Sequence, residues 1–323
     1  MAISRVGFGA WAIGGADWAF AWGPQDDGES IAAIRHAVRA GINWIDTAAV
    51  YGLGHSEEVV ARALRDIPLD ERPYVFSKCG LVWDLQDRLA PAQRIGDAVS
   101  IRRELEASLR RLQVDQIDLY QMHWPAHDVG LEEYWQTILD LKREGKIRAA
   151  GLSNHSVAQL EQAELLGHVD SLQPPFSAIV RREAAEIAWC AAHETGVIVY
   201  SPMQAGLLSG AFSAERAAAL TAGDWRSRNA EFKGERLERN LALAGALEPI
   251  AARHDTSVAA VAVAWTLAWP GVTGAIVGAR NAEQVDGWLP AAGLALDAAD
   301  LDAIASVIAA TGAGEGPSRP PAD

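Results

Sequence analysis

The sequence predicts a single α/β barrel in which eight parallel strands alternate with helices. Short apolar runs alternate with longer amphipathic segments along most of the chain, a pattern typical of parallel strands joined by right-handed helical crossovers. Eight such runs in 323 residues leave about 40 residues per unit, the size of a (β/α)8 TIM barrel with insertions. No linker rich in Gly, Ser or Pro interrupts the series, so we expect one barrel domain over residues 1–310.

The predicted strands are short runs with the spacing typical of β-strands. They cover residues 4–9, 43–46, 74–78, 117–121, 148–152, 171–173, 197–200 and 275–277. The predicted helices between them carry apolar residues at three- and four-residue spacing. The clearest cover residues 30–40, 101–112, 131–144, 156–166 and 183–195. Ser156 and Gln159 have the spacing of a capping box, which marks the start of a helix.

Two segments depart from the alternation. Residues 203–235 form a long irregular insertion after the seventh strand, and we expect a loop there over the active end of the barrel. Residues 311–323 are rich in Gly and Pro, and we expect them to form a disordered C-terminal tail.

Composition and charge exclude several classes of function. The chain has 28 Lys and Arg against 42 Asp and Glu, and its net charge of −14 argues against nucleic acid as the main partner. It shows no signal peptide and no apolar stretch of about 18 residues, so we expect no membrane insertion. The two cysteines form no C-x-x-C motif, which excludes a disulfide scaffold and a cysteine-rich zinc site. These features predict a cytoplasmic protein.

Four polar residues lie at the strand ends where barrel enzymes carry their catalytic groups. Asp46, Lys78 and His123 close the second, third and fourth strands, and Tyr51 follows Asp46 by five residues. A neighbouring ammonium stabilises a phenolate, so we expect Lys78 to lower the pKa of Tyr51 from about 10 and Asp46 to keep Lys78 charged. With His123 donating a hydrogen bond to the substrate oxygen, this group suits the protonation of an alkoxide that develops from a carbonyl.

Two other motifs are weaker. Gly7-x-Gly9-x-x-Ala12 imitates a dinucleotide-binding fingerprint, but the residues after it are not helical and the strand before it is minimal. His123 and His127 have the spacing of helical zinc ligands, yet Pro125 lies between them directly after a strand. We therefore expect neither a Rossmann domain nor a metal site.

Several blocks of the sequence resemble the aldo-keto reductase family. In family order these blocks are 41–52 (GINWIDTAAVYG), 56–57 (SE), 77–78 (SK), 118–125 (DLYQMHWP), 151–154 (GLSN), 173–177 (QPPFS), 200–210 (YSPMQAGLLSG) and 276–284 (IVGARNAEQ). The resemblance, to a bacterial NADP-dependent member, implies a TIM barrel that reduces carbonyl compounds with NADPH. It also implies that Tyr51 is the acid and that Asp46, Lys78 and His123 are its partners.

The resemblance further implies where NADP(H) binds. Ser153, Asn154 and Gln173 would hold the nicotinamide carboxamide, Tyr200 would stack on the ring, and the backbone of 201–210 would line the pyrophosphate. Arg280 would pair with the 2′-phosphate, since guanidinium binds phosphate well. The residues expected at the cofactor are Trp11, Asp46, Ser153, Asn154, Gln173, Tyr200, Ser201, Pro202, Met203, Gly206, Leu208, Gly210, Gly278, Arg280 and Gln284.

The chain departs from the family in three places. Members usually begin with a β-hairpin that closes the N-terminal end of the barrel, whereas Met1 here lies almost on the first strand. Trp288 stands where many members place an Asn against the adenine. The insertion after the seventh strand diverges from the family, so Trp225, Arg226 and Arg228 receive no cofactor role.

Tryptophans follow several strands at the end that carries Tyr51. Trp18 and Trp22 follow the first strand, Trp83 the third and Trp124 the fourth. We expect these four to line a broad apolar substrate pocket that favours bulky or ring-containing carbonyls. The alternative, that they only pack the loops, stays open at this point.

Three functions are compatible with these observations. The leading hypothesis is an NADPH-dependent oxidoreductase that interconverts a small-molecule carbonyl and an alcohol. A second is an NADPH-binding regulatory or sensor protein with little turnover. A third is a Schiff-base aldolase that uses Lys78, which the presence of Tyr51 and the cofactor blocks disfavours. The sequence carries no signal for the oligomeric state.

Overall fold

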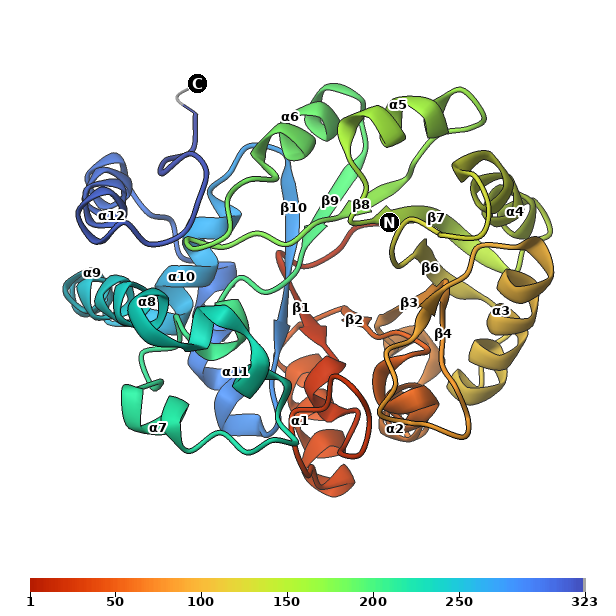
Figure 1. Ribbon diagram of the computed structural model, residues 1–323, viewed down its shortest axis with the longest axis horizontal. Coiled ribbons are helices and arrows are strands. Elements are labelled where there is room, and N and C mark those ends of the chain that lie inside the picture. Colours follow the sequence, from red (N-terminus) through yellow and green to blue (C-terminus); the bar gives the residue numbers. More distant parts are fainter. Residues whose placement is uncertain (322–323) are drawn as a thin grey trace.

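The computed structural model describes residues 1–321 and confirms the predicted barrel (Figure 1). Eight parallel strands close into one sheet in the order β1-β10-β9-β8-β7-β6-β3-β2. Their bounds are β1 Val6–Gly9, β2 Trp44–Asp46, β3 Tyr74–Cys79, β6 Ile117–Met122, β7 Ile147–Ser153, β8 Ser171–Gln173, β9 Gly196–Val199 and β10 Val272–Gly278. A separate antiparallel hairpin, β4 Leu81–Val82 with β5 Gln93–Arg94, interrupts the connection after β3.

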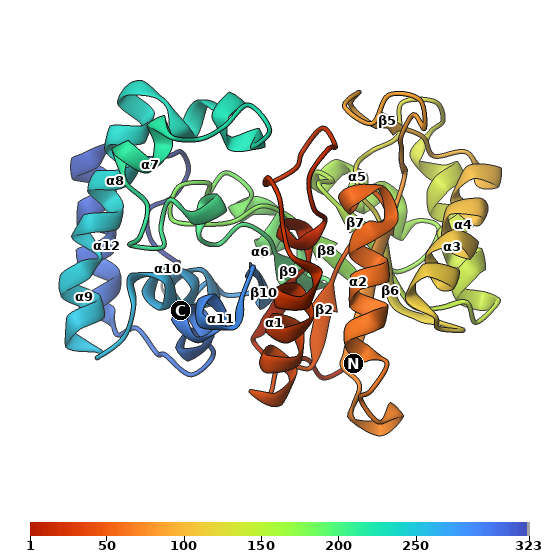
Figure 2. The same ribbon diagram turned by 90° about the horizontal axis from the view of Figure 1, so that it is seen from below.

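Helices surround the sheet on the outside of the barrel (Figures 1 and 2). The α-helices are α1 Asp27–Arg39, α2 His55–Leu64, α3 Ala98–Leu112, α4 Leu131–Arg143, α5 Val157–Glu164, α6 Ala184–Ala192, α7 Ala214–Ala218, α8 Gly234–Ala246, α9 Glu248–Arg253, α10 Val258–Leu267, α11 Ala282–Trp288 and α12 Ala298–Thr311. Short 3-10 turns are η1 Trp11–Ile13, η2 Tyr51–Gly54, η3 Leu69–Glu71, η4 Gln204–Gly206, η5 Trp225–Arg228, η6 Ala230–Phe232 and η7 Leu289–Ala292. The capping box of Ser156 and Gln159 is present at the start of α5. Within the described residues, no helix is both long and apolar enough to cross a bilayer.

Trp44 on β2 fills the lower part of the barrel interior. Its ring is fully buried against Phe76 and Leu119, and its Nε1 donates a hydrogen bond to the Ser4 carbonyl at 2.8 Å. A Cβ on Gly7 would lie 2.2 Å from the Trp44 ring, so only glycine fits beside it. Only a small hollow of about 330 Å³ remains at this end, and the larger open space lies at the other end, where the strands finish.

Two long connections cover the C-terminal end of the barrel (Figure 2). One joins β1 to α1, and the other, residues 200–233, joins β9 to α8 through short helices only. Trp22 and Asp224 form an antiparallel bridge between them, and the Trp225 amide donates to the Ala21 carbonyl at 3.0 Å. The rings of Trp11 and Trp225 stack with centroids 5.0 Å apart. These contacts hold the two connections together over one side of the barrel mouth.

The described part of the C-terminal segment is ordered, which differs from the disordered tail expected for 311–323. The Arg181 amide donates to the Glu315 carbonyl at 3.0 Å, and the Arg181 guanidinium donates to the Ala313 carbonyl at 3.2 Å. A Cβ on Gly314 would lie 1.8 Å from the Ile179 carbonyl oxygen, so glycine here permits close backbone packing. The composition gave no sign of this, because the packing partner is distant in the sequence. Residues 322–323 of the expected tail lie outside the described residues.

Candidate active site

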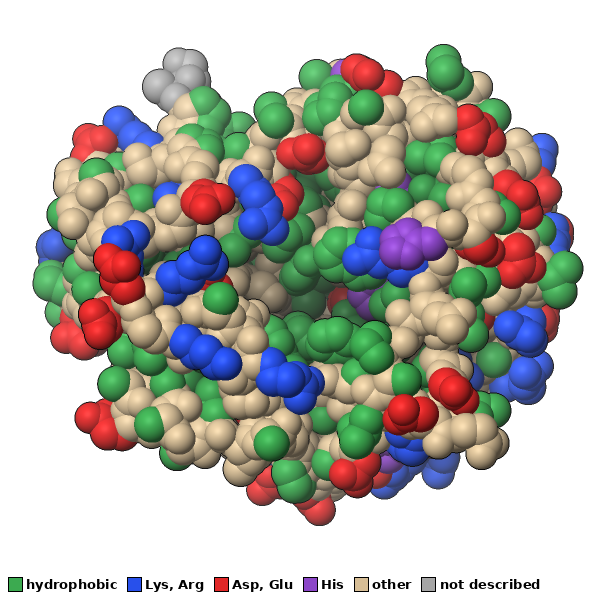
Figure 3. Space-filling model, viewed as in Figure 1, with side chains coloured by type: hydrophobic (Ala, Val, Ile, Leu, Met, Phe, Trp, Pro, Cys, Tyr) green, Lys and Arg blue, Asp and Glu red, His purple; other side chains and the backbone are tan. Residues whose placement is uncertain are grey.

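A cavity of about 1270 Å³ opens at the C-terminal end of the barrel, and Figure 3 shows it as a hollow in this face. The strand ends and the connections after them form its walls. Most of the predicted site residues line it, namely Trp11, Trp18, Trp22, Asp46, Tyr51, His123, Trp124, Asn154, Gln173, Tyr200, Ser201, Pro202, Met203, Gly206, Gly278, Arg280 and Gln284.

A buried ion pair lies at the floor of the cavity. Lys78 Nζ on β3 donates to Asp46 Oδ1 on β2 at 2.6 Å and to the Thr47 carbonyl at 2.9 Å, and Gln173 Nε2 on β8 donates to Asp46 Oδ2 at 2.9 Å. Burial lowers the pKa of Lys78, and the charge of Asp46 opposes this shift. Burial likewise raises the pKa of Asp46, which Lys78 opposes. Each charge therefore offsets the desolvation of the other.

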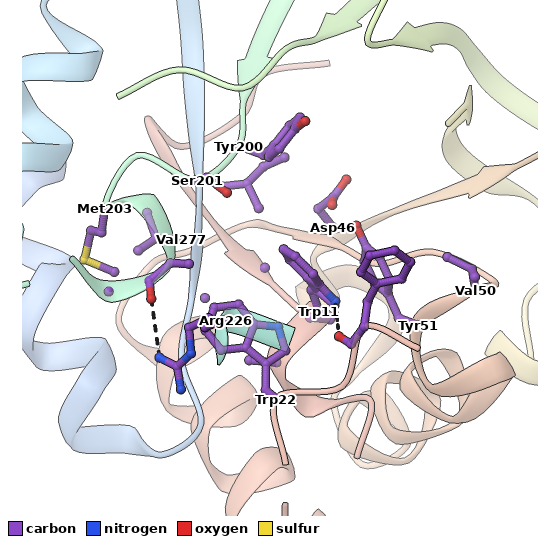
Figure 4. Close-up of a pocket in the computed structure, with 18 of the residues that line it drawn as sticks. Trp11, Trp22, Asp46, Val50, Tyr51, Tyr200, Ser201, Met203, Arg226 and Val277 are labelled. Carbon is purple, nitrogen blue, oxygen red and sulfur yellow. Dashed lines mark hydrogen bonds between the residues drawn. The ribbon is translucent and has the colours of Figure 1, made fainter. Parts of the chain in front are cut away.

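Tyr51 lies above this pair at the start of η2. The centroid of its ring is 5.3 Å from Lys78 Nζ and 5.8 Å from that of the His123 ring, which meets it edge-on at 78°. After Tyr51 the backbone turns through left-handed conformations at Gly52 (φ 62°) and Leu53 (φ 58°). A Cβ at position 52 would lie 2.0 Å from the Gly14 carbonyl oxygen, so the turn packs closely against the β1–α1 connection. Figure 4 shows Tyr51 beside Asp46 and Trp11 in the cavity wall.

The charge states at Tyr51 and His123 follow from burial. Burial raises the pKa of Tyr51 well above its usual value, and the Asp46 charge raises it further. The expected net lowering of this pKa is therefore not found, because desolvation outweighs the stabilisation of the phenolate by Lys78. Burial, with the positive charges of Lys78 and Arg94, lowers the pKa of His123 well below its usual value. The site thus holds a protonated phenol and a neutral imidazole.

A hydrogen-bonded network joins the ends of β6, β7, β8 and β9. Asn154 Nδ2 donates to the His123 carbonyl at 2.9 Å and to Ser153 Oγ at 3.0 Å, and the Tyr200 hydroxyl donates to Asn154 Oδ1 at 2.8 Å. Ser153 Oγ donates to the Gln173 carbonyl at 2.8 Å. Among residues 1–321, Gln173 Oε1 has no hydrogen-bond partner. This oxygen can therefore accept a hydrogen bond from a ligand amide.

Basic side chains gather at the opposite end of the cavity. Arg216, Arg226 and Arg280 line it there, and burial with the charges of Arg226 and Arg216 lowers the pKa of Arg280. Arg226 pairs with Asp224 at 2.6 Å and stacks 4.7 Å from the Trp22 ring (Figure 4). This concentration of positive charge, in a chain of net charge −14, suits a phosphate-bearing ligand.

The connection after β9 supplies backbone between these two ends. Ser201 (φ 57°) and Ala205 (φ 53°) have left-handed conformations, and Ser201 and Gly206 line the cavity. With the free oxygen of Gln173 and the aromatic wall of Tyr200 at one end and arginines at the other, the lining fits a nicotinamide dinucleotide.

Five predicted site residues are absent from the cavity wall. Leu208 is fully buried in the main core. Gly210 packs against α10, where an added Cβ would lie 2.9 Å from Val258 Cβ. Trp83 packs against a small cluster that contains Trp18, but it does not line the cavity itself. Lys78 and Ser153 also lie behind the surface, but they bind residues that form it.

Several cavity residues were absent from the prediction. They are Phe20, Val50, Leu81, Arg94, His127, Phe212, Arg216 and Arg226. All lie in connections between barrel strands, where periodicity carries no information. Trp288 is also in the wall.

Within residues 1–321 no group of three or more His, Cys, Asp or Glu side chains is arranged to hold a metal ion.

Comparisons with known proteins agree with the barrel fold. A family model described as "Aldo/keto reductase family" matches residues 5–309. The chain is 34% identical over 307 residues to aldo-keto reductase YhdN of Bacillus subtilis, covering 94% of this chain and 90% of that protein. It is 34% identical over 296 residues to the NADH-specific methylglyoxal reductase of Escherichia coli, covering 88% of each. The solved structure of the glycerol dehydrogenase AKR11B4 from Gluconobacter oxydans is 35% identical, with a TM-score of 0.87 over 97% of this chain and 94% of that one.

Proposed function

This chain belongs to the aldo/keto reductase family of oxidoreductases that act on carbonyl compounds, and from that premise we propose that it interconverts a carbonyl and an alcohol with NADPH and uses Tyr51 as the acid. One observation carries the proposal. The Tyr51 phenol lines the cavity beside the His123 imidazole, and the buried Nζ of Lys78 lies 5.3 Å from the centroid of the Tyr51 ring. This set can protonate an oxygen anion without a nucleophile.

The roles of the side chains follow from their positions. The nicotinamide supplies a hydride when it is bound. Tyr51 and His123 each donate a hydrogen bond to the substrate oxygen, and Tyr51 then gives up its proton. Lys78 stabilises the phenolate that remains, and Asp46 keeps Lys78 charged. In alcohol oxidation the phenolate of Tyr51 takes the proton back.

Two alternative hypotheses can be distinguished from this proposal. The contacts of Lys78 bear on the Schiff-base aldolase, and an activity assay bears on the NADPH-binding sensor. Lys78 Nζ is buried and is already bound to Asp46 and to the Thr47 carbonyl, which speaks against a Schiff base with substrate. A screen of aldehydes, ketones, sugars and quinones for NADPH oxidation tests the enzyme hypothesis directly. Tight NADPH binding without turnover of any compound would instead favour the sensor.

The choice of NADPH rests on the arginines at the far end of the cavity. Arg280 Nε donates to Gln25 Oε1 at 2.5 Å, which holds its guanidinium beside Arg226. Gln173, Asn154 and Tyr200 would hold the nicotinamide end. The E. coli relative is named NADH-specific, so cofactor preference needs its own measurement.

Arg280→Ala should weaken NADPH binding by about 1.5–3 kcal/mol, the range for a charge-assisted contact, and should change NADH binding much less. Titration of both cofactors by fluorescence checks this. Arg228→Ala is the matched control, because Arg228 is an exposed arginine outside the cavity wall. Equal loss for both cofactors would contradict the assignment, and Arg226→Ala would then be the variant to compare.

Substrate shape should depend on Trp124 and not on Trp83. Trp124 lines the cavity, whereas Trp83 packs against the cluster around Trp18 without lining the cavity. Trp124→Ala should raise KM for ring-containing carbonyls about tenfold, or roughly 1.4 kcal/mol, because stacking area is lost. Trp83→Ala should leave KM and the Kd of NADPH unchanged. Steady-state kinetics with benzaldehydes tests both, and no change in either variant would return Trp124 to a packing role.

We propose a cytoplasmic location on the basis of the thiols. Cys79 and Cys190 are both free and buried, an arrangement that suits a reducing compartment. Fractionation of cells that express the chain, with periplasmic and cytoplasmic marker enzymes, tests this location.

A further inference from the structure

The β4–β5 hairpin places one arginine at the substrate side of the cavity. Arg94 on β5 pairs with Leu81 on β4, and both residues line the cavity. The hairpin is anchored at its base, where the Gly80 amide donates to buried Glu104 Oε2 at 3.0 Å and the Ile95 amide donates to the Gly80 carbonyl at 3.2 Å. Arg94 therefore extends from a backbone that the hairpin and these hydrogen bonds fix in position.

The guanidinium of Arg94 stacks on Trp124 and is otherwise unengaged. Its Cζ lies 4.5 Å from the centroid of the Trp124 ring. Among residues 1–321, Arg94 forms no ion pair and its side chain donates no hydrogen bond. Arg216, Arg226 and Arg280, at the opposite end of the cavity, each donate at least one hydrogen bond. The donors of Arg94 are thus available to a ligand.

The positive charge of Arg94 acts on His123, one of the proposed reacting groups. It contributes to the lowered pKa of His123, so the guanidinium lies within electrostatic range of the imidazole. His127 lines the same wall, and its amide donates to the Arg94 carbonyl at 3.0 Å. The carboxylate on this wall, Asp128, already accepts from the amides of Gly96 at 2.7 Å and Asp97 at 3.2 Å. The Asp128 carboxylate is therefore bound by backbone amides and forms no ion pair with Arg94 among the described residues.

We propose that Arg94 binds an anionic group of the substrate, so that the preferred substrates are aldehydes or ketones that also carry a carboxylate or a phosphate. A guanidinium binds either group through paired hydrogen bonds. The Trp124 ring covers one face of the Arg94 guanidinium and shields that face from water. In a chain of net charge −14, an anionic substrate needs such a local positive site to enter the cavity. Figure 3 shows basic side chains on both sides of the hollow, which allows separate sites for cofactor phosphates and substrate anion. The inference rests on the proposed carbonyl reduction and names its substrate class.

Matched substrate pairs test this assignment. One pair is 4-carboxybenzaldehyde and methyl 4-formylbenzoate, and the other is 4-formylphenyl phosphate and 4-methoxybenzaldehyde. The readout is the ratio of kcat/KM for the anionic member to that for the neutral member. Arg94→Gln should lower this ratio at least tenfold, and Arg94→Lys should retain part of it. Arg88→Gln is the matched control, since Arg88 lies on the same connection but outside the cavity wall, and its ratio should stay within twofold.

The outcomes separate the possible roles of Arg94. A fall confined to one pair identifies carboxylate or phosphate as the group bound. An unchanged ratio in Arg94→Gln overturns the proposal. An equal loss for both members of a pair also overturns it, because Arg94 would then act only through His123. If the wild-type protein turned over none of these aldehydes and no compound of the wider screen, the proposed function would fail. Benzoate binding, followed by tryptophan fluorescence with methyl benzoate as the neutral counterpart, would still test Arg94.

Discussion

Tyr51→Phe is expected to lower kcat for carbonyl reduction at least ~100-fold, the lower scale for loss of a positioned general acid. The phenol is the protonated group that lines the cavity, and Lys78 behind it is bound to Asp46, so neither neighbour can replace the lost proton donor. The variant keeps the ring and its contacts with Trp11 and His123. The Kd of NADPH should therefore stay unchanged in a fluorescence titration.

The fold of this variant should be intact. The Tyr51 hydroxyl has no hydrogen-bond partner among residues 1–321, so its removal leaves no buried group unpaired. Tyr74→Phe is the control, because Tyr74 begins β3 at the opposite end of the barrel. Near-normal turnover by Tyr51→Phe would refute the mechanism. Loss of turnover in Tyr74→Phe would show that removing a hydroxyl far from the site lowers activity by destabilising the fold.

Lys78→Met should cause a loss of kcat comparable to that of Tyr51→Phe. The positive charge near the Tyr51 ring stabilises the phenolate, so its removal raises the pKa of Tyr51 further. Alcohol oxidation needs the phenolate and carbonyl reduction needs the phenol. The rise of oxidation with pH and the fall of reduction with pH should both move to higher pH. Profiles of kcat/KM against pH in both directions measure this shift.

The same substitution also removes the partner of a buried carboxylate. Asp46 is almost fully buried, and an uncompensated buried charge costs about 3–5 kcal/mol. Lys78→Met should therefore lower the free energy of unfolding, whereas Lys78→Met with Asp46→Asn should recover most of it. Denaturant unfolding measures this recovery. If activity returned together with stability in the double variant, Lys78 would have only a structural role.

Much of the fold and of the candidate catalytic group could be predicted from local sequence. Strands and helices differ in the spacing of their apolar residues, and alternation of the two requires parallel strands. Asp46, Lys78 and His123 were predicted to converge because the ends of parallel barrel strands meet on one face. The structure brings them together as expected, at β2, β3 and the end of β6.

The connections between strands were the less predictable part. Arg94 and Arg226 reach the cavity from segments without periodicity, and their positions depend on contacts with Leu81 and Asp224 that are formed only in the fold. Gly314 lies in a segment that resembles a disordered tail, yet it packs on Ile179. Leu208 belongs to a predicted cofactor block and points into the core.

The sequence alone therefore determined the barrel, its strand ends to within one residue and the four polar groups that meet there, since these follow from periodicity and from residue type at known positions. Only the tertiary structure decided which connection residues line the cavity and which groups are buried. Burial depends on segments far apart in the chain, and it reversed the expected direction of the Tyr51 pKa. Desolvation is a property of the assembled site, which no local pattern of residues records.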